Sequence, residues 1–137
     1  MVWGKLMGRS VTPEVRAYLE TMLMLSLADG ELEDDELRDL GTTIARHPKM
    51  ADLGNRQIID TLLKAWDDID KQGMDRRMKS VAGMLSHDQR IDAIGMAISI
   101  AASDGEIEPD ERIMLEKLQN SFGLSDTDIE EAMRRYR

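Results

Sequence analysis

Residues 28–36 read ADGELEDDE, and residues 103–111 read SDGEIEPDE. Each copy follows an almost wholly apolar stretch, and both share the pattern Asp-Gly-Glu-aliphatic-Glu-x-Asp-Glu at an offset of 75 residues. Glycine at the end of an apolar helical run lets the chain reverse direction, and the acids after it favour the N-terminus of a following helix. The repeat therefore predicts two equivalent helix–turn–helix units in one fold.

The two turns also concentrate negative charge. Residues 29–39 carry seven acids against one base, and residues 104–112 carry five acids against one base, in a chain of net charge −9. Phosphate backbones and anionic lipid surfaces are bound by clustered Lys and Arg. We therefore expect no nucleic-acid partner, and we look for function at the two acidic turns.

Composition limits the class of protein. A chain of 137 residues is most simply one domain that can bury its own core. It has no cysteine, which excludes disulfides, thiolate metal sites and thiol redox chemistry by this chain. No apolar run approaches the ~20 residues that span a bilayer, and residues 1–9 lack the apolar region of a signal peptide. These features predict a cytoplasmic protein without direct membrane insertion.

Helical spacing of apolar residues dominates the chain, and period-two alternation never persists. We expect an all-α, compact single-domain bundle of about seven helices, with residues 1–11 as a tail and 12–137 as the domain. Trp3 in the tail is either free or an anchor packed on the domain. The predicted helices span about 13–28, 34–46, 55–71, 75–86, 91–103, 109–121 and a last segment that opens at residue 125.

Two of these helices should form the buried centre. Residues 22–28 and 91–102 are apolar around most of the helix circumference, which is typical of a central helix. An internal pseudo-twofold repeat should relate 13–46 to 90–122. In the helix over 55–71, the apolar residues expected to face inward are Ile58, Ile59, Leu62, Leu63, Trp66 and Ile69.

Each acidic turn resembles the second half of an EF-hand loop, with Asp at position five, Gly at six, an aliphatic residue at eight and Glu at twelve. Positions one and three would then be Leu25 and Leu27 in the first copy, and Ile100 and Ala102 in the second. These side chains cannot coordinate a hard cation. Neither copy is a complete EF-hand.

Two interpretations of the turns remain open. In one, the glycines reverse the chain and the acids only cap helices. In the other, the pseudo-twofold brings both turns to one concave surface, where carboxylates about 7 Å apart repel by roughly 2 kcal/mol per pair and recruit a cation or a basic partner. The candidate ligands are Asp29, Glu31, Glu36, Asp104, Glu106 and Glu111. Such all-oxygen sites suit Ca²⁺ or Mg²⁺, bound weakly with Kd on the order of 10⁻⁴ M or above.

The motifs at 27–32 and 102–111, with the closing run over 115–125, resemble the TerB-like family associated with tellurite resistance. The resemblance covers nearly the whole chain, and Ser103 and Pro48 depart from the family pattern. It implies a compact helical domain in which the same six acids form a cation site. Related domains occur alone or fused to DnaJ-type modules in membrane-anchored co-chaperones, which implies a protein partner with a basic or membrane-associated surface.

Signals of catalysis are missing from the sequence. It contains no nucleophile elbow, phosphate-binding loop or zinc-protease motif, and no thiol that could reduce tellurite. His47 and His87 lie beside helix ends, where capping or solvation explains them. We expect a non-catalytic interaction module in tellurite resistance or envelope stress. The alternatives are a purely structural helical adaptor and a metal-assisted enzyme.

Overall fold

A computed structural model describes residues 11–103 and 105–136 of the chain. Within these residues the fold consists of seven α-helices and one short 3₁₀ helix, without strands, so the predicted all-α class is confirmed. In chain order the helices are α2 (Pro13–Ser26), α3 (Asp34–Ala45), η1 (Pro48–Met50), α4 (Asn55–Gln72), α5 (Met74–Met84), α6 (His87–Ala102), α7 (Pro109–Ser121) and α8 (Asp126–Arg135).

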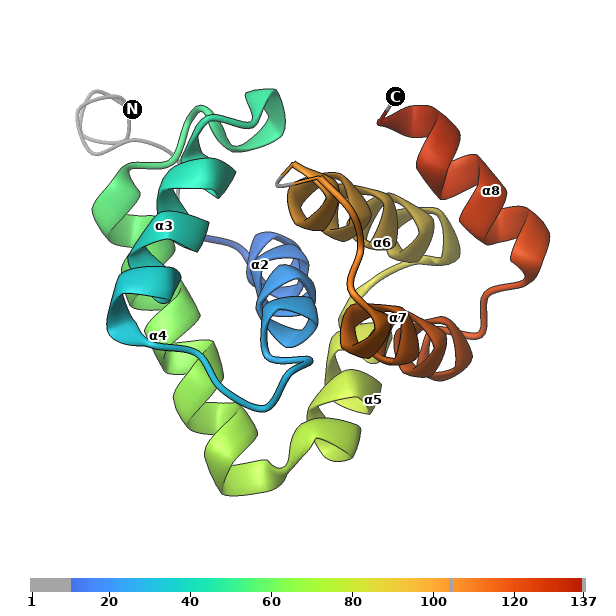
Figure 1. Ribbon diagram of the computed structural model, residues 1–137, viewed down its shortest axis with the longest axis horizontal. Coiled ribbons are helices and arrows are strands. Elements are labelled where there is room, and N and C mark those ends of the chain that lie inside the picture. The colour runs from blue at the N-terminus through green and yellow to red at the C-terminus, as the bar shows by residue number, and fades with distance from the viewer. Residues whose placement is uncertain (1–10, 104, 137) are drawn as a thin grey trace.

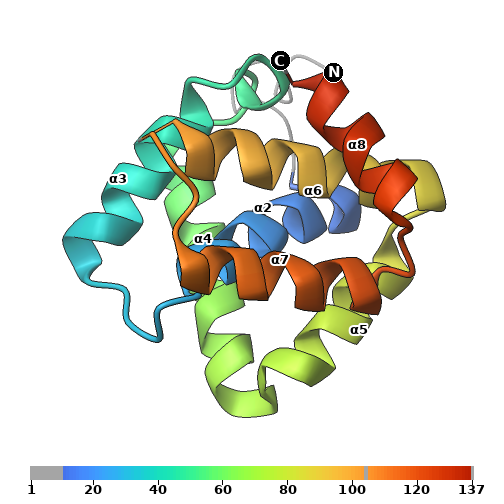
Figure 2. The same ribbon diagram turned by 45° about the vertical axis from the view of Figure 1, so that its right-hand side comes forward.

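Helix α2 lies at the centre of the molecule. Figures 1 and 2 show α3 and α4 on one side of it and α6 and α7 on the other, with α5 beneath and α8 packed outside α6. Of the helices in the described ranges, none combines the length and apolar character needed to cross a bilayer.

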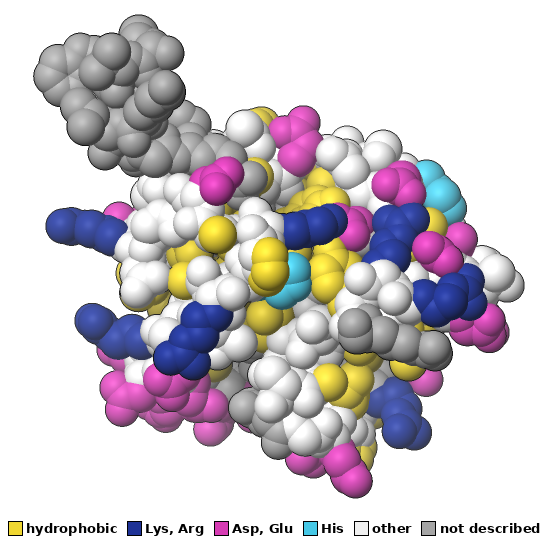
Figure 3. All heavy atoms as spheres, turned by 90° about the horizontal axis from the view of Figure 1, so that it is seen from above, with side chains coloured by type: hydrophobic (Ala, Val, Ile, Leu, Met, Phe, Trp, Pro, Cys, Tyr) yellow, Lys and Arg dark blue, Asp and Glu magenta, His cyan; other side chains and the backbone are white. Residues whose placement is uncertain are grey.

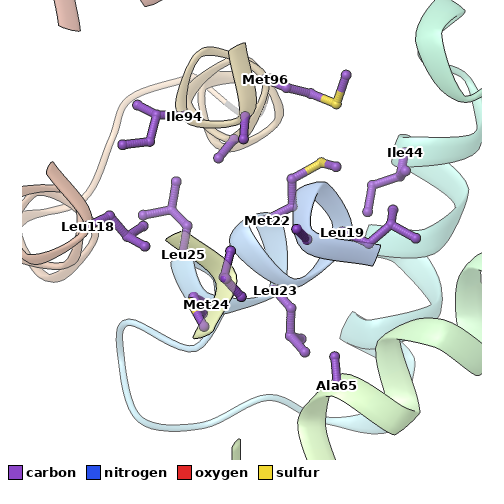
Figure 4. Close-up of a cluster of buried hydrophobic side chains, with 14 of the residues drawn as sticks. Leu19, Met22, Leu23, Met24, Leu25, Ile44, Ala65, Ile94, Met96 and Leu118 are labelled. Carbon is purple, nitrogen blue, oxygen red and sulfur yellow. The ribbon is translucent and has the colours of Figure 1, made fainter. Parts of the chain in front are cut away.

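The sequence of α2 explains its central position. The four consecutive residues Met22–Leu25 are all buried, so this part of the helix has no polar face to turn toward water. Figure 4 shows Leu25 pointing toward Leu118 of α7, while Leu23 points toward Ala65 of α4. The rest of the fold therefore encloses α2 from several directions.

The predicted buried centre is confirmed in part. Residues 22–25 and 91–97 are buried as expected. The last turn of α6 is not, because residues 98–101 are half-buried and Ala102 is exposed. Ile100 and Ala101 of this turn line the cavity described below, which leaves them partly exposed.

One helix boundary was predicted wrongly. The sequence placed helices over 75–86 and 91–103, but α6 begins at His87. Ser86 is its N-cap: the Ser86 Oγ accepts a hydrogen bond from the Gln89 backbone N–H at 3.2 Å, and the Gln89 Oε1 accepts one from the Ser86 N–H at 2.9 Å. This Ser-x-x-Gln capping box can be recognised in the sequence. His87 and Asp88 therefore belong to the first turn of α6 and do not interrupt the helix.

The inward face of α4 was also predicted imperfectly. Leu63 was expected to face the core, yet it is 46% exposed, and Ala65 is buried instead. The buried stripe runs through Ile58, Leu62, Ala65 and Ile69, which is the four–three–four spacing of one helix face. Leu63 lies one position off that stripe and so faces solvent.

A buried ion pair fixes α5 against α2. Glu20 lies fully buried in α2, and Arg77 of α5 donates to both of its carboxylate oxygens, from Nε and from Nη2, each at 2.8 Å. The side chain of Arg16 extends this network by bonding both Glu20 and Asp68. Because removing one partner of such a pair leaves an uncompensated buried charge, the pair determines how α5 sits on α2.

Helix α8 approaches α6 at a glycine. A Cβ atom built at Gly95 would lie 2.6 Å from the carbonyl oxygen of Ala132 and 2.8 Å from the ring of Tyr136. Real side-chain carbons do not come so close to a backbone oxygen. Glycine at this position is therefore what allows α8 to pack directly on α6.

We predict that Gly95→Ala destabilises the protein by about 1–3 kcal/mol, since the added methyl group must push α8 away from α6. The melting temperature should fall by roughly 3–10 °C. Gly83→Ala is the matched control, because a Cβ at Gly83 in α5 meets nothing within 4 Å, and alanine is the better helix former. Thermal melting followed by circular dichroism should show the first variant less stable and the control equal to or above the native protein.

Candidate functional site

An open cavity of about 800 Å³ lies where the C-terminal ends of α2 and α6 meet α3 and the start of α7. In Figure 2, α3, the α2–α3 turn and the α6–α7 turn occupy the same side of the molecule. The two acidic turns, 75 residues apart in sequence, therefore border a single space. We call it the acidic cavity.

The acidic cavity combines an apolar wall with an acidic one. Its apolar side chains include Leu25, Ala28, Leu32, Leu40, Ile100 and Ala101. Its acidic residues are Asp29, Glu36, Asp39, Glu106, Glu108, Asp110 and Glu111. The described lining contains no Lys, Arg or His, so its formal charge is uncompensated within the wall.

The structure brings together most, not all, of the acids that the sequence singled out. Asp29, Glu36, Glu106 and Glu111 line the acidic cavity. Glu31 is exposed and is not part of the lining. Asp104 lies outside the described residues.

Three acids of the lining were missed at the sequence level, namely Asp39, Glu108 and Asp110. Asp39 follows Glu36 by three residues in a helix, and this spacing places two side chains on the same face. That periodicity was a usable signal. The positions of Glu108 and Asp110 depend on how the α6–α7 turn folds over the cavity, which a local pattern does not reveal.

Both turns use their last glutamate in the same way. The Glu36 Oε1 accepts a hydrogen bond from the Glu33 backbone N–H at 3.0 Å, and the Glu111 Oε1 accepts one from the Glu108 N–H at 2.9 Å. Each glutamate therefore reaches back to the N-cap residue that precedes its own helix, as in a capping box. The capping interpretation is correct for these two residues.

The start of the first turn is fixed by an aspartate. The Asp29 Oδ1 accepts a hydrogen bond from the Glu31 N–H at 3.1 Å, and Gly30 adopts a φ of +88°, which side chains disfavour. Gly105 occupies the equivalent place in the second turn with a φ of +123°. A carboxylate has two oxygens and several acceptor sites, so an acid that stabilises the turn can still face a ligand.

A preformed metal site requires several ligand side chains close to one point, and not only around one cavity. Among the described residues, no three His, Asp or Glu side chains are grouped so that they could hold one metal ion. The acids border a common cavity without converging on one point. The described carboxylates alone therefore do not make a closed coordination shell, and the predicted cation site stays a prediction.

A second polar cluster, missed in the sequence, surrounds Asp92 of α6. The Tyr18 hydroxyl donates to its Oδ2 at 2.9 Å, and the Tyr136 hydroxyl donates to its Oδ1 at 2.8 Å. The ammonium of Lys49 also bonds this carboxylate, and an Arg135 nitrogen lies 3.9 Å away. The signal was present, because Asp92 is a lone acid inside an otherwise apolar run.

These contacts set the charge of the cluster. Burial alone would raise the pKa of Asp92, but hydrogen bonds from Lys49, Tyr136 and Tyr18 outweigh it and hold the pKa below its ordinary value. Burial and the bond to Asp92 raise the pKa of both tyrosines. The Asp92 cluster joins α2, η1, α6 and the end of α8, and it does not line the acidic cavity. The Asp92 cluster therefore stabilises the packing of these four elements against one another.

The two histidines have the modest roles expected of them. The His47 Nδ1 accepts a hydrogen bond from the Lys49 N–H at 3.2 Å and so caps η1, and its ring lies 5.4 Å from that of Tyr136. Burial and then the charge of Lys49 lower its pKa. His87 is exposed, with its Nε2 3.4 Å from Asp128. Neither histidine lines the acidic cavity.

Comparison with known proteins gives one match. The family model described as tellurite resistance protein TerB matches residues 10–134, nearly the whole chain. The chain belongs to the TerB family. No curated protein and no solved structure matches it. The TerB match includes both acidic turns and all elements that border the acidic cavity, which confirms the resemblance drawn from the repeated motifs.

We predict that Asp92→Asn destabilises this TerB-family chain by about 1–3 kcal/mol at neutral pH, because Lys49 and the tyrosines lose a charged acceptor. The folded-state pKa of Asp92 is depressed, so its contribution is present above the unfolded pKa of about 3.9 and disappears as the pH falls through the folded value. Melting temperatures of variant and native protein should therefore converge as the pH falls below about 4. A gap that stays constant over this range would contradict the charged role of Asp92, and Asp70→Asn, an exposed acid of α4, is the control.

Proposed function

We propose that this TerB-family chain is a non-catalytic interaction module whose acidic cavity binds a basic, partly apolar segment of a partner protein. The setting we propose is tellurite resistance or a related envelope-stress response, which follows from the family alone. The observation that carries the proposal is that acids from both turns surround one cavity with an apolar wall.

Charge favours a basic ligand. Seven acids face the acidic cavity without a basic residue in its described lining, so a cation entering it gains attraction and also relieves repulsion among the carboxylates. Figure 3 shows the uneven charge more widely, with Lys and Arg spread singly over the face seen and acids gathered at the edge on the side of α3 and α4. The cavity therefore favours positively charged ligands over negatively charged ones.

The apolar wall favours a peptide over a bare ion. Within this wall, Ile100, Ala101 and Leu32 are half-buried in the free chain. Covering such side chains contributes about 25 cal/mol per Å² of apolar surface removed from water. The long stems of Lys and Arg, or a neighbouring aliphatic side chain, can supply this cover while the charged groups meet the acids. A volume of about 800 Å³ accommodates a few side chains of such a segment.

The repeated turns support an internal duplication. Both contain a glycine with positive φ and a glutamate that bonds the backbone N–H of its helix N-cap. We propose that the two helix–turn–helix units are related by the pseudo-twofold expected from the sequence. This would explain why the two acidic turns border one space.

A non-catalytic role fits the chemistry of the cavity. Its lining offers carboxylates and a few hydroxyls, and the chain has no thiol for redox chemistry with tellurite. The absence of cysteine also fits the cytoplasmic location that we propose. The competing proposal is a structural adaptor whose acids only cap helices.

A second proposed ligand is a divalent cation, Ca²⁺ or Mg²⁺, at the same acids. The presence of Glu36 and Glu111, one from each turn, in the same lining favours it. The lack of a three-carboxylate group among the described residues argues for weak binding with water completing the shell. The structure favours the basic segment as the main ligand. A bound cation would compete with it.

We predict that a synthetic ten-residue peptide of alternating Leu and Lys binds the protein, and that the Leu–Glu counterpart does not. Affinity should fall steeply as salt rises, since the attraction is screened. Asp39→Asn/Glu106→Gln, which neutralises two exposed acids of the acidic cavity, should weaken binding about tenfold or more. Fluorescence anisotropy of the labelled peptide measures all three effects.

The matched control is Asp70→Asn/Glu116→Gln, which removes two exposed acids outside the lining of the acidic cavity. It changes the net charge equally, so any loss due to overall charge appears in both variants. Equal binding by the two double variants would refute the cavity as the binding site.

A calcium titration tests the cation proposal. At ten times Kd a bound ion stabilises the folded state by about 1.4 kcal/mol, which raises the melting temperature by several degrees. Asp29→Asn/Asp104→Asn should lose most of this response. No response in the native protein at about 10 mM Ca²⁺ would refute the cation proposal. An equal response in the variant would place the ion elsewhere.

A further inference from the structure

The chain contains a segment of the kind that the acidic cavity is proposed to bind. Residues 1–10 include Lys5 and Arg9 and no acid, and half of them are apolar, among them Trp3 and Leu6. The first acid of the chain is Glu14. In a protein of net charge −9, this segment has the opposite character to the cavity.

We propose that residues 1–10 of one copy of this chain dock in the acidic cavity of a second copy. This inference rests on the proposed function of the cavity and names one ligand for it. The chain then both carries a binding site for basic segments and supplies such a segment.

Charge and polarity match on the two sides. Lys5 and Arg9 would meet the exposed acids Asp39 and Glu106 at the cavity. Trp3 and Leu6 would cover the half-buried apolar side chains of Ile100 and Ala101. The acids supply the attraction, and the apolar contact supplies burial that a simple cation would not gain.

The segment over residues 1–10 is too short to fill the acidic cavity of its own chain. Thr12 caps the start of α2, whereas the acidic cavity lies at its other end, near Leu25 and Asp29. A helix of 14 residues is about 21 Å long. If the segment from Trp3 to Arg9 fills the cavity, the three steps of the chain from Arg9 to Thr12 span at most about 11 Å. The segment therefore has to enter another copy.

The geometry also determines the type of assembly. The donor segment leaves from the N-terminal end of α2, and the acceptor cavity is at its C-terminal end, so the contact joins two different surfaces. Such heterologous contacts build rings or open chains, unless two copies exchange segments reciprocally. In each case the association depends on concentration and salt.

The test uses full-length protein and measures its mass by sedimentation over a range of concentrations. The native chain should associate at low salt and dissociate at about 0.5 M salt, where charge attraction is screened. Lys5→Glu/Arg9→Glu should be monomeric, because its segment is acidic. Asp39→Lys/Glu106→Lys should also be monomeric, because its cavity has lost most of its negative charge. A 1:1 mixture of these two variants should restore association as a pair, since the native basic segment of the cavity variant can dock in the native acidic cavity of the segment variant.

Arg46→Glu/Lys79→Glu is the matched control. It changes the net charge as much as the segment variant does, but at exposed bases of the folded domain outside the acidic cavity. It should associate like the native chain. Helical content by circular dichroism checks that every variant is folded.

Three outcomes would overturn the inference: a native chain that stays monomeric, association unaffected by Lys5→Glu/Arg9→Glu, or no restoration in the mixture. These outcomes are separable from failure of the proposed function. If the Leu–Lys peptide binds the cavity while the native chain stays monomeric, the cavity keeps its proposed function and only this inference falls. If the peptide also fails to bind, both fall.

Discussion

The fold depends on the burial of α2 on nearly all sides. Met22, Leu23, Met24 and Leu25 are apolar in succession and all buried. At the surface, every orientation of this helix would leave an apolar face in water, so the other helices have to enclose it. Helix α6, which is buried over residues 91–97, packs beside it. The two central helices end next to the same space, and the turns that follow them border it together. The acidic cavity is therefore a consequence of how the core is built.

Polar contacts inside this apolar core decide orientation. Hydrophobic burial is nearly non-directional, so several arrangements of α5 and α8 around α2 and α6 would cover similar areas. Arg77 donates two hydrogen bonds of 2.8 Å to the buried Glu20. Asp92 accepts hydrogen bonds from the hydroxyl groups of Tyr18 and Tyr136. Each contact tolerates little rotation or sliding of the helices. They fix the two outer helices without contributing to the cavity itself.

The acids of the two turns act at two levels. Glu36, Glu111 and Asp29 satisfy backbone N–H groups where a helix begins or a turn is formed, and the same residues border the acidic cavity. Local capping explains why acids occur in each turn. Capping does not explain why two turns with uncompensated charge share one space beside an apolar wall. The proposed binding of a basic segment would explain that arrangement.

The sequence by itself determined the all-α class, most helix positions, and the two acidic turns, because these follow from periodicity and from residues within four positions of one another. Family membership followed from the same local motifs. The tertiary structure alone decided that Asp39, Glu108 and Asp110 join the acidic cavity while Glu31 stays outside its lining, that Asp92 is buried against tyrosines 74 and 44 residues away, and that α8 rests on Gly95. These facts depend on which helix faces meet across long sequence separations. That outcome is set by packing of the whole core, and no local pattern encodes it.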